Sequence, residues 1–243
     1  MAAPATETRW ESLRRLKGGL VVSCQASPGE PLCAPEHIRA LSLSAVNGGA
    51  AGLRLEGAEN IRAVRAATAV PIVGLVKSPL VTDADRLNRV YITATFAEAQ
   101  EIAGAGADVI AIDATDRPRP DGLSAALLIE RIHEELGKPV WADIATLAEA
   151  AQAAEHGADL VSTTLSGYTA ETLAPPESGP DLELLDKLCR HLSVPAALEG
   201  RVWHPQEVRR AFELGAFAVV VGSAITRPQL VTRRFVGACP PVE

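Results

Sequence analysis

Eight side chains that can carry charge or form hydrogen bonds follow directly after short apolar runs in this chain of 243 residues. Amines and carboxylates can take up and return protons, and cationic or amide groups can stabilise a developing negative charge. Gathered in one place, such groups would form the active site of an enzyme. In chain order they are Gln25, Arg54, Lys77, Asp113, Asp143, Thr163 or Thr164, Glu199 and Ser223.

The apolar runs themselves are the elements that would position these groups. They alternate with longer, Ala-rich helical stretches such as residues 95–106. Short apolar runs between helices are typical of buried parallel strands. Eight such units predict a single α/β domain over residues 1–243, a (β/α)8 TIM barrel of the phosphate-binding type with its active site where the strands end. An open doubly wound sheet is the alternative, and eight nearly uniform units favour closure.

Lys77 is the strongest candidate for a base. Strand residues alternate in direction, so an inward Lys77 would share the barrel interior with Val73 and Leu75. Apolar surroundings and crowding by Arg54 from the neighbouring strand would favour a neutral amine, which can accept a proton. The alternative is a lysine that is simply paired with a carboxylate or that lies on a solvated loop.

Two glycine-containing loops predict a phosphate site. Gly200 and Arg201 follow the seventh run, and Gly222, Ser223 and Arg227 follow the eighth. Barrels often bind phosphate with the loops after strands seven and eight, where backbone N–H groups approach the anion and an arginine adds a bidentate contact. A single Gly-Ser pair could be only a turn, but two such loops with arginines favour phosphate.

Composition and charge exclude several classes of protein. The 30 acidic and 23 basic residues leave a net charge of −7, which disfavours a nucleic-acid partner. No run approaches the ~20 apolar residues of a membrane span, and residues 1–19 lack a signal peptide's apolar stretch. The four cysteines form no CxxC pair and the five histidines show no ligand spacing, so we expect reduced thiols, a cytoplasmic location and no metal ion.

Seven segments resemble one family and occur in its order. They are VVSCQA (21–26), AAGLRLEGAENI (50–61), VYITATFAEAQEIAGAGADVIAIDATDRPRP (90–120), ADIATLAEA (142–150), TTLSGYT (163–169), LEGRV (198–202) and GSAITRP (222–228). The chain resembles N-acetylmannosamine-6-phosphate 2-epimerase from about residue 20 to residue 235. This resemblance implies a cofactor-free enzyme that interconverts N-acetylmannosamine 6-phosphate and N-acetylglucosamine 6-phosphate in sialic-acid and amino-sugar catabolism.

The resemblance also assigns roles to individual residues. Lys77 and Glu199 match the catalytic pair that would remove and return the proton at C2, although the pattern leaves open which of them removes it. The predicted sugar contacts are Gln25, Arg54, Asp143, Thr163 and Arg201. The predicted phosphate contacts are Gly200, Gly222, Ser223 and Arg227. Trp141, Trp203 and His204 depart from the family pattern, and residues 170–181 form a loop that either covers the substrate or merely connects two elements.

Two rival functions and one question of assembly remain open from the sequence. Another phosphate-binding barrel isomerase or synthase would need other groups at its strand ends, and a non-catalytic sugar-phosphate binder would lack the base or the acid. The segment after Pro228 is short and carries Leu230, Val231, Phe235 and Val236. Exposed apolar side chains of this kind often mark an interface. We therefore expect a homodimer, as the resemblance also implies, with exchange of the C-terminal helix left open.

Overall fold

Eight parallel strands close into a barrel in the order β1 to β8, each paired with its sequence neighbours and β8 with β1. The computed structural model describes residues 5–175 and 178–240. The strands are β1 (Leu20–Cys24), β2 (Gly52–Glu56), β3 (Ile72–Leu75), β4 (Val109–Asp113), β5 (Val140–Asp143), β6 (Leu160–Ser162), β7 (Ala196–Glu199) and β8 (Ala218–Val221). This architecture confirms the predicted (β/α)8 barrel.

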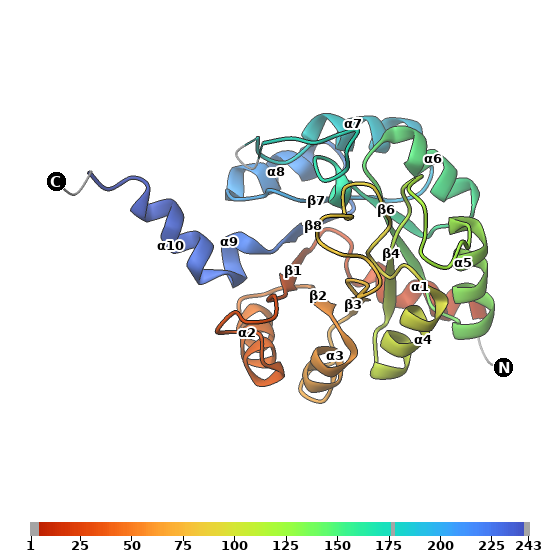
Figure 1. Ribbon diagram of the computed structural model, residues 1–243, viewed down its shortest axis with the longest axis horizontal. Coiled ribbons are helices and arrows are strands. Elements are labelled where there is room, and N and C mark those ends of the chain that lie inside the picture. The colour runs from red at the N-terminus through yellow and green to blue at the C-terminus, as the bar shows by residue number, and fades with distance from the viewer. Residues whose placement is uncertain (1–4, 176–177, 241–243) are drawn as a thin grey trace.

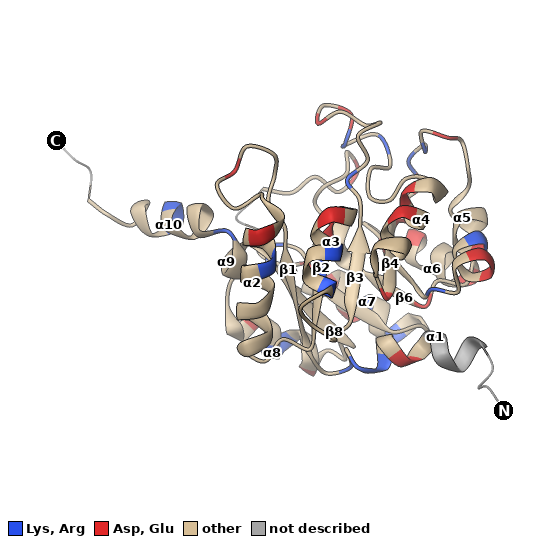
Figure 2. Ribbon diagram, turned by 90° about the horizontal axis from the view of Figure 1, so that it is seen from below, with Lys and Arg blue, Asp and Glu red and all other residues tan. Residues whose placement is uncertain are grey.

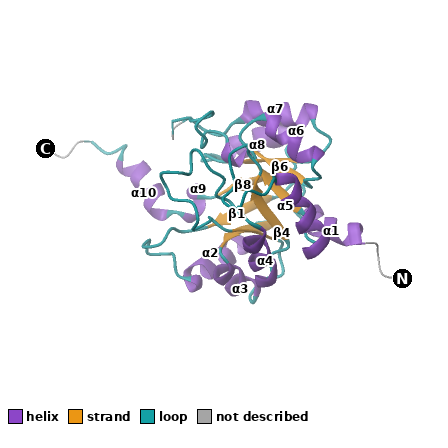
Figure 3. Ribbon diagram, turned by 45° about the vertical axis from the view of Figure 1, so that its right-hand side comes forward, coloured by secondary structure: helices purple, strands orange, loops and turns teal. Residues whose placement is uncertain are grey.

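Helices surround the strands, as Figures 1 and 3 show. They are α1 (Ala5–Arg14), α2 (Pro35–Asn47), α3 (Ala58–Arg65), α4 (Phe96–Ala105), α5 (Ala125–Arg131), α6 (Leu147–Glu155), α7 (Leu182–His191), α8 (Pro205–Glu213), α9 (Ser223–Thr226) and α10 (Pro228–Val236). A π-helical turn (Ile132–Leu136) extends α5, and a 3-10 turn (Thr163–Leu165) follows β6.

Local sequence signals fix several of these helix ends. Thr95 and Thr146 cap α4 and α6, each accepting a hydrogen bond from the backbone N–H of a glutamate three residues later, Glu98 or Glu149, whose side chain bonds back. Gly106 ends α4 in a left-handed conformation with φ 107°, which favours glycine. Both ends of α4 are therefore fixed by the local sequence.

Two apolar layers result from the alternation of side chains along each strand. The inner layer fills the barrel and includes Val73, Leu75, Trp141 and Ala197, all with 0–1% exposure. The outer layer packs under the helices and includes Leu53, Ile110 and Leu198. The predicted inward direction of Val73 and Leu75 is thereby confirmed, and Trp141 forms part of the barrel floor.

The two ends of the barrel differ. Leu13 and Leu16, in and just after α1, join the inner apolar layer, and the backbone N–H of Gly18 donates to Phe217 O before β8. The long loops rise from the opposite end, as Figure 2 shows. Because all strands are parallel, their carboxyl ends meet under these loops, where the candidate site should lie.

The C-terminal helix α10 extends away from the barrel (Figure 1). None of its residues, all of which the structure describes, is buried, and Phe235 and Val236 are 73% and 61% exposed. Arg234 contacts the loop after β7: its guanidinium lies 5.0 Å from the centre of the Trp203 ring and forms a hydrogen bond with His204. Within residues 5–175 and 178–240, no helix is long and apolar enough to cross a membrane.

Candidate active site

A cavity of about 960 Å³ opens at the carboxyl ends of the strands. Nine of the eleven predicted site residues line it: Gln25, Arg54, Lys77, Glu199, Gly200, Arg201, Gly222, Ser223 and Arg227. Asp143 lies directly beneath and is fully buried, and Thr163 does not face the cavity. The fold thus brings groups from distant parts of the chain into one concave site.

Arg54 is the centre of a buried ionic network. Its Nη2 lies 2.5 Å from Asp143 Oδ2, and its Nε lies 3.2 Å from Glu199 Oε1. Burial alone would lower the pKa of Arg54, but the carboxylates of Asp143 and Glu199 raise it. Nη1 is buried and has no hydrogen-bond partner among the described residues, so a bound substrate oxygen could use this donor.

Asp143 is held from below as well as from the side. Trp141 Nε1 donates to Ser162 Oγ at 2.7 Å, and Ser162 Oγ donates to Asp143 Oδ1 at 2.9 Å. The unusual Trp141 therefore has a polar as well as a packing role. Together with Arg54, this chain of bonds fixes the carboxylate of Asp143 under the cavity.

Glu199 has the most strongly perturbed carboxyl group at the site. Its side chain is only 13% exposed. Burial raises its pKa to about 7, with Asp143 acting in the same direction and Arg54, Thr164 and Lys77 opposing. A carboxyl group with a pKa near neutrality can both give and accept a proton at working pH. This is the behaviour expected of the predicted acid–base residue.

Thr164, and not Thr163, faces the cavity. Thr164 Oγ1 lies 2.7 Å from Asp143 Oδ1 and 3.1 Å from Glu199 Oε2. Thr163 is 1% exposed, and its hydroxyl donates to Glu199 O and accepts from Glu199 N. The geometry favours Thr164 over the predicted Thr163 as a sugar contact, because the 3-10 turn after β6 directs Thr163 towards the backbone of β7 and Thr164 into the site.

Lys77 reaches the cavity two residues beyond β3. Its Nζ lies 2.9 Å from Glu56 Oε2, at the last position of β2. Arg54, from the same strand as Glu56, pairs instead with Asp143 and Glu199. Glu56 was missed by the sequence interpretation, which ended the second apolar run at Arg54, whereas β2 continues through Leu55 to Glu56.

The backbone beside Lys77 is held in an uncommon conformation. Thr93 has a φ of 44°, a backbone conformation that residues other than glycine seldom adopt. Its N–H donates to Val76 O at 2.7 Å, and Val76 N donates to Thr93 Oγ1 at 3.1 Å. These bonds fix the residue directly before Lys77, and strained residues of this kind cluster at functional sites.

Tyr91 is a further cavity residue that the sequence interpretation overlooked. Its ring lies between two guanidinium groups, those of Arg86 at 5.2 Å and Arg117 at 5.7 Å. Burial and the nearby Asp113 raise the pKa of Tyr91 to about 12, so its hydroxyl remains a donor at neutral pH. Asp113 itself is fully buried and pairs with Arg117, so this strand-end carboxylate supports the loops rather than the cavity.

The predicted phosphate end lies at the loops after β7 and β8. Gly200 adopts a φ of 103°, and Gly222 packs so closely on β1 that an added Cβ would lie 3.3 Å from Ser23 Cβ. Thr226 Oγ1 donates to Ser23 O at 2.7 Å, which ties α9 to β1. Arg227 follows α9 and forms an ion pair with Glu30, a residue of the loop between β1 and α2.

Arg201 lines the cavity but its guanidinium serves the loop after β6. Nε donates to Gly179 O and Nη1 to Ser166 O, both at 2.6 Å. The same guanidinium lies 5.4 Å from the ring of Tyr168. These donors are occupied by the protein itself, so the arrangement supports a positioning role for Arg201 more directly than the predicted sugar contact.

The loop at residues 170–181 is part of the site wall. Leu173, Ala174 and Pro175 line the cavity beside Tyr168. Residues 176–177 of this loop lie outside the described residues. The described part favours the covering role over that of a passive connector.

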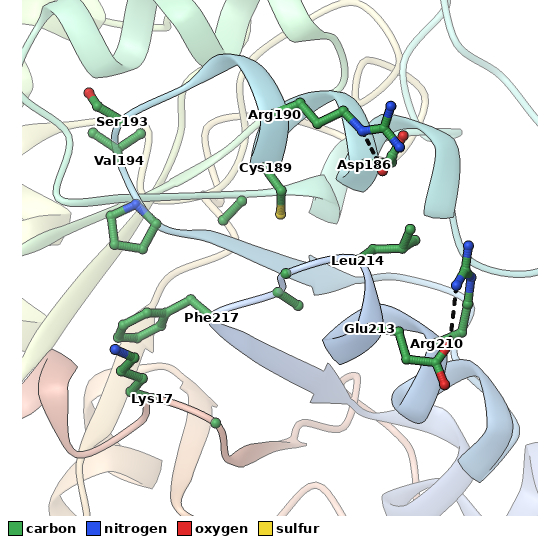
Figure 4. A pocket seen from close by; sticks show the side chains of 15 residues that line it. Lys17, Asp186, Cys189, Arg190, Ser193, Val194, Arg210, Glu213, Leu214 and Phe217 are labelled. Carbon is green, nitrogen blue, oxygen red and sulfur yellow. Dashed lines mark hydrogen bonds and ion pairs between the residues drawn. The ribbon is translucent and has the colours of Figure 1, made fainter.

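A second hollow, of about 740 Å³, lies at the opposite end of the barrel beside Lys17, Cys189 and Phe217 (Figure 4). Arg190 and Arg210 at its edge are paired with Asp186 and Glu213 on their own helices. Active sites of barrel enzymes lie at the other end. Across the described residues, no group of three or more His, Cys, Asp or Glu side chains could hold a metal ion.

Comparison with known proteins agrees with this geometry. The model of the NanE family, described as "Putative N-acetylmannosamine-6-phosphate epimerase", matches residues 38–240. Proteins called "Putative N-acetylmannosamine-6-phosphate 2-epimerase" from Thermosynechococcus vestitus and Caldanaerobacter subterraneus subsp. tengcongensis are 49% and 45% identical. Each alignment covers 92% of this chain, and 94% and 92% of the respective relatives.

Two solved structures extend the comparison. The N-acetylmannosamine-6-phosphate 2-epimerase from Clostridium perfringens superposes with a TM-score of 0.86 and 39% identity, over 93% of this chain and 96% of that one. Thiamine phosphate pyrophosphorylase from Pyrococcus furiosus matches with a TM-score of 0.58 over 93% of this chain and 98% of its own. At 16% identity, this second likeness reflects the barrel fold alone.

Proposed function

The chain belongs to the N-acetylmannosamine-6-phosphate epimerase family, and from this premise we propose that it interconverts N-acetylmannosamine 6-phosphate and N-acetylglucosamine 6-phosphate. The reaction inverts C2 by removing its proton and returning one to the opposite face. The observation that carries this proposal is the meeting of Lys77 and Glu199 in one cavity, with the pKa of Glu199 raised to about 7.

The placement of the two groups suits inversion. Lys77 follows β3 and Glu199 ends β7, and these strands stand four positions apart in a closed barrel of eight. A sugar bound between them would present one face of C2 to each group. One residue then accepts the proton while the other, already protonated, supplies a proton to the opposite face.

The remaining groups address the charge that develops during this transfer. The C2 proton becomes acidic once the ring opens and C1 is an aldehyde, and its removal places negative charge on the C1 oxygen. The Arg54 guanidinium, fixed by Asp143 and with Nη1 available, is suited to stabilise that charge. Gln25 and Thr164 would contact sugar hydroxyls, and Tyr91 adds a phenolic donor on the Lys77 side.

The phosphate would bind at the other end of the cavity, beside Gly200, Gly222, Ser223 and Arg227. Glycines allow close approach of backbone N–H groups, and a guanidinium forms charge-assisted bonds with phosphate oxygens. Holding the phosphate there would fix the position of C2 between Lys77 and Glu199.

The direct test is an interconversion assay. Purified protein incubated with N-acetylmannosamine 6-phosphate should produce N-acetylglucosamine 6-phosphate, followed by proton NMR of the anomeric signals. No added metal or organic cofactor should be required. Unphosphorylated N-acetylmannosamine is the matched control substrate and should react far more slowly. Absence of the product sugar phosphate would favour a non-catalytic binding protein.

We further propose a homodimer in which α10 packs on the second copy. Two observations support this proposal. Helix α10 points away from its own barrel, and Phe235 and Val236 on it are exposed. Exposed apolar side chains gathered on one helix favour an interface, and two-fold dimers are the commonest assembly. If α10 is exchanged between the copies, the α10 of each copy would cover the barrel of the other, in the place of the helix that follows strand eight in a barrel.

We also propose a cytoplasmic location and a role in sialic-acid and amino-sugar catabolism. The four cysteines, Cys24, Cys33, Cys189 and Cys239, are free thiols, as expected in a reducing compartment. The proposed role follows from the substrate of the reaction, because epimerisation converts N-acetylmannosamine 6-phosphate into N-acetylglucosamine 6-phosphate. Fractionation of cells that produce the protein would test the location.

A further inference from the structure

Arg227, the arginine at the proposed phosphate end of the cavity, is already paired with a carboxylate of the protein itself. Arg227 Nη2 donates to Oε1 of Glu30, and the two side chains are 21% and 23% exposed. Glu30 comes from the loop between β1 and α2, almost two hundred residues earlier in the chain. The loop presents it firmly, because Ser27 N donates to Glu30 Oε2 at 2.9 Å and Glu30 N donates to Ser27 O at 3.0 Å.

The charge on Glu30 is secure at neutral pH. Partial burial acts to raise its pKa, but the Ser27 N–H, Arg227 and Gln229 together lower it below the ordinary value. A full negative charge therefore faces the guanidinium that the proposed function gives to the phosphate. Carboxylate and phosphate bind the guanidinium in the same way, through paired oxygens on its N–H groups.

Arg227 nevertheless remains incompletely bonded. Its Nε is buried and has no hydrogen-bond partner among the described residues. Leaving a buried donor unsatisfied is costly, particularly on a charged group. The guanidinium is thus occupied on one side by Glu30 and retains a donor that a ligand could satisfy.

We propose that Glu30 is a specificity-determining residue that competes with the phosphate of the sugar for Arg227. This inference rests on the proposed phosphate site. A phosphate monoester carries about −1.5 to −2 charges at pH 7, against −1 for the carboxylate. The phosphate can therefore displace or outcompete Glu30 at Arg227, whereas a singly charged anion or an uncharged sugar cannot. Specificity of this kind comes from a repulsive element set against the wrong ligand.

A purely supporting role for Glu30 would have the opposite consequence. If Glu30 only oriented Arg227, its loss would weaken phosphate binding. If Glu30 competes, removal of its charge strengthens binding. Glu30→Gln separates the two, because the amide keeps the size of the side chain and one acceptor oxygen, for either Ser27 N or Arg227, but removes the negative charge.

The experiment is calorimetric titration of the intact protein with inorganic phosphate and, separately, with acetate as a singly charged anion. Partly exposed ion pairs contribute modestly, so Glu30→Gln should bind phosphate about three- to tenfold more tightly. Acetate, which cannot displace Glu30 from Arg227 in the wild type, should bind measurably to this variant, and the KM for the sugar phosphate should fall. Glu36→Gln, which removes the same charge from an exposed position in the first turn of α2, should behave as the wild type.

Weaker or unchanged phosphate binding by Glu30→Gln would overturn the inference. If that variant does not fold, as judged by its thermal melting, Glu30→Ala provides the same comparison with the carboxylate absent. Failure of the wild type to bind phosphate at all would instead remove the phosphate site of the proposed function, and this inference with it. Equal binding by wild type and Glu30→Gln would remove only the role of Glu30.

Discussion

Lys77 and Glu199 are both ionisable but have different surroundings. Lys77 lies 2.9 Å from the Glu56 carboxylate at the edge of the cavity, whereas Glu199 is nearly buried among Arg54, Asp143 and Thr164. A pair that must exchange roles in the two directions of a reversible reaction needs one proton between its members. With both protonated, neither can accept the proton from C2.

The pH dependence of catalysis follows from this requirement. Because burial raises the pKa of Glu199 to about 7, acidification through that pH protonates its carboxylate, which can then no longer accept a proton. We expect kcat/KM to fall as the pH decreases through about 7. Glu199→Gln should lose this limb along with most of its activity. A profile that is flat between pH 8 and pH 5.5 would contradict the role of Glu199, and a limb near pH 6 that persists in the variant would belong to the substrate phosphate.

Arg227 should matter for binding more than for chemistry. Charge-assisted hydrogen bonds contribute roughly 1.5–3 kcal/mol each, so Arg227→Ala should weaken binding of the sugar phosphate by about one to two powers of ten. Steady-state KM and direct calorimetry would measure the loss. Arg233→Ala on the exposed part of α10 is the matched control. Equal binding of N-acetylmannosamine with and without its phosphate would disprove the assignment.

At the scale of elements, the strands were readable from the sequence because each combines a buried apolar run with a polar end. This pattern identified Gln25, Arg54, Lys77 and Glu199, all of which line the cavity. The same pattern missed Glu56, because it ended the second run at Arg54 while β2 continues for two more residues.

Contacts made by loops could not be predicted in this way. The choice between Thr163 and Thr164 depends on a 3-10 turn that no local pattern announces. The contacts of Arg201 with Ser166 and Gly179, and of Arg227 with Glu30, join segments far apart in sequence. A single sequence shows which side chains a loop contains. Which residues those side chains contact depends on how the loop folds against distant parts of the chain.

The loop after β6 should depend on Arg201. Because its guanidinium bonds Ser166 O and Gly179 O, Arg201→Ala should loosen residues 166–181 and raise the KM, with a smaller effect on kcat. Hydrogen exchange of the loop amides would show the loosening. Arg209→Ala, on the exposed surface of α8, is the control. Unchanged exchange in the loop would show that Arg201 does not hold it.

At the scale of the whole molecule, the proposed homodimer depends on α10. Light scattering at micromolar concentration should give a mass near twice the 25.5 kDa of one chain. Phe235→Asp should shift the mass towards that of a single chain, since it places a charge on the apolar face that α10 exposes. Thr232→Asp, an exposed polar position on the same helix, should leave it unchanged. A single-chain mass for the wild type would contradict the dimer.

The central claim is that Lys77 and Glu199 exchange the proton at C2, and isotope incorporation tests it most directly. In heavy water, the wild type should place deuterium at C2 of the sugar phosphate as the two epimers interconvert, observed by NMR. Lys77→Ala and Glu199→Gln should each lose about three or more powers of ten in turnover, while Lys138→Ala should retain it. Near-normal turnover by both variants, or interconversion by the wild type without deuterium at C2 at any stage, would contradict the account.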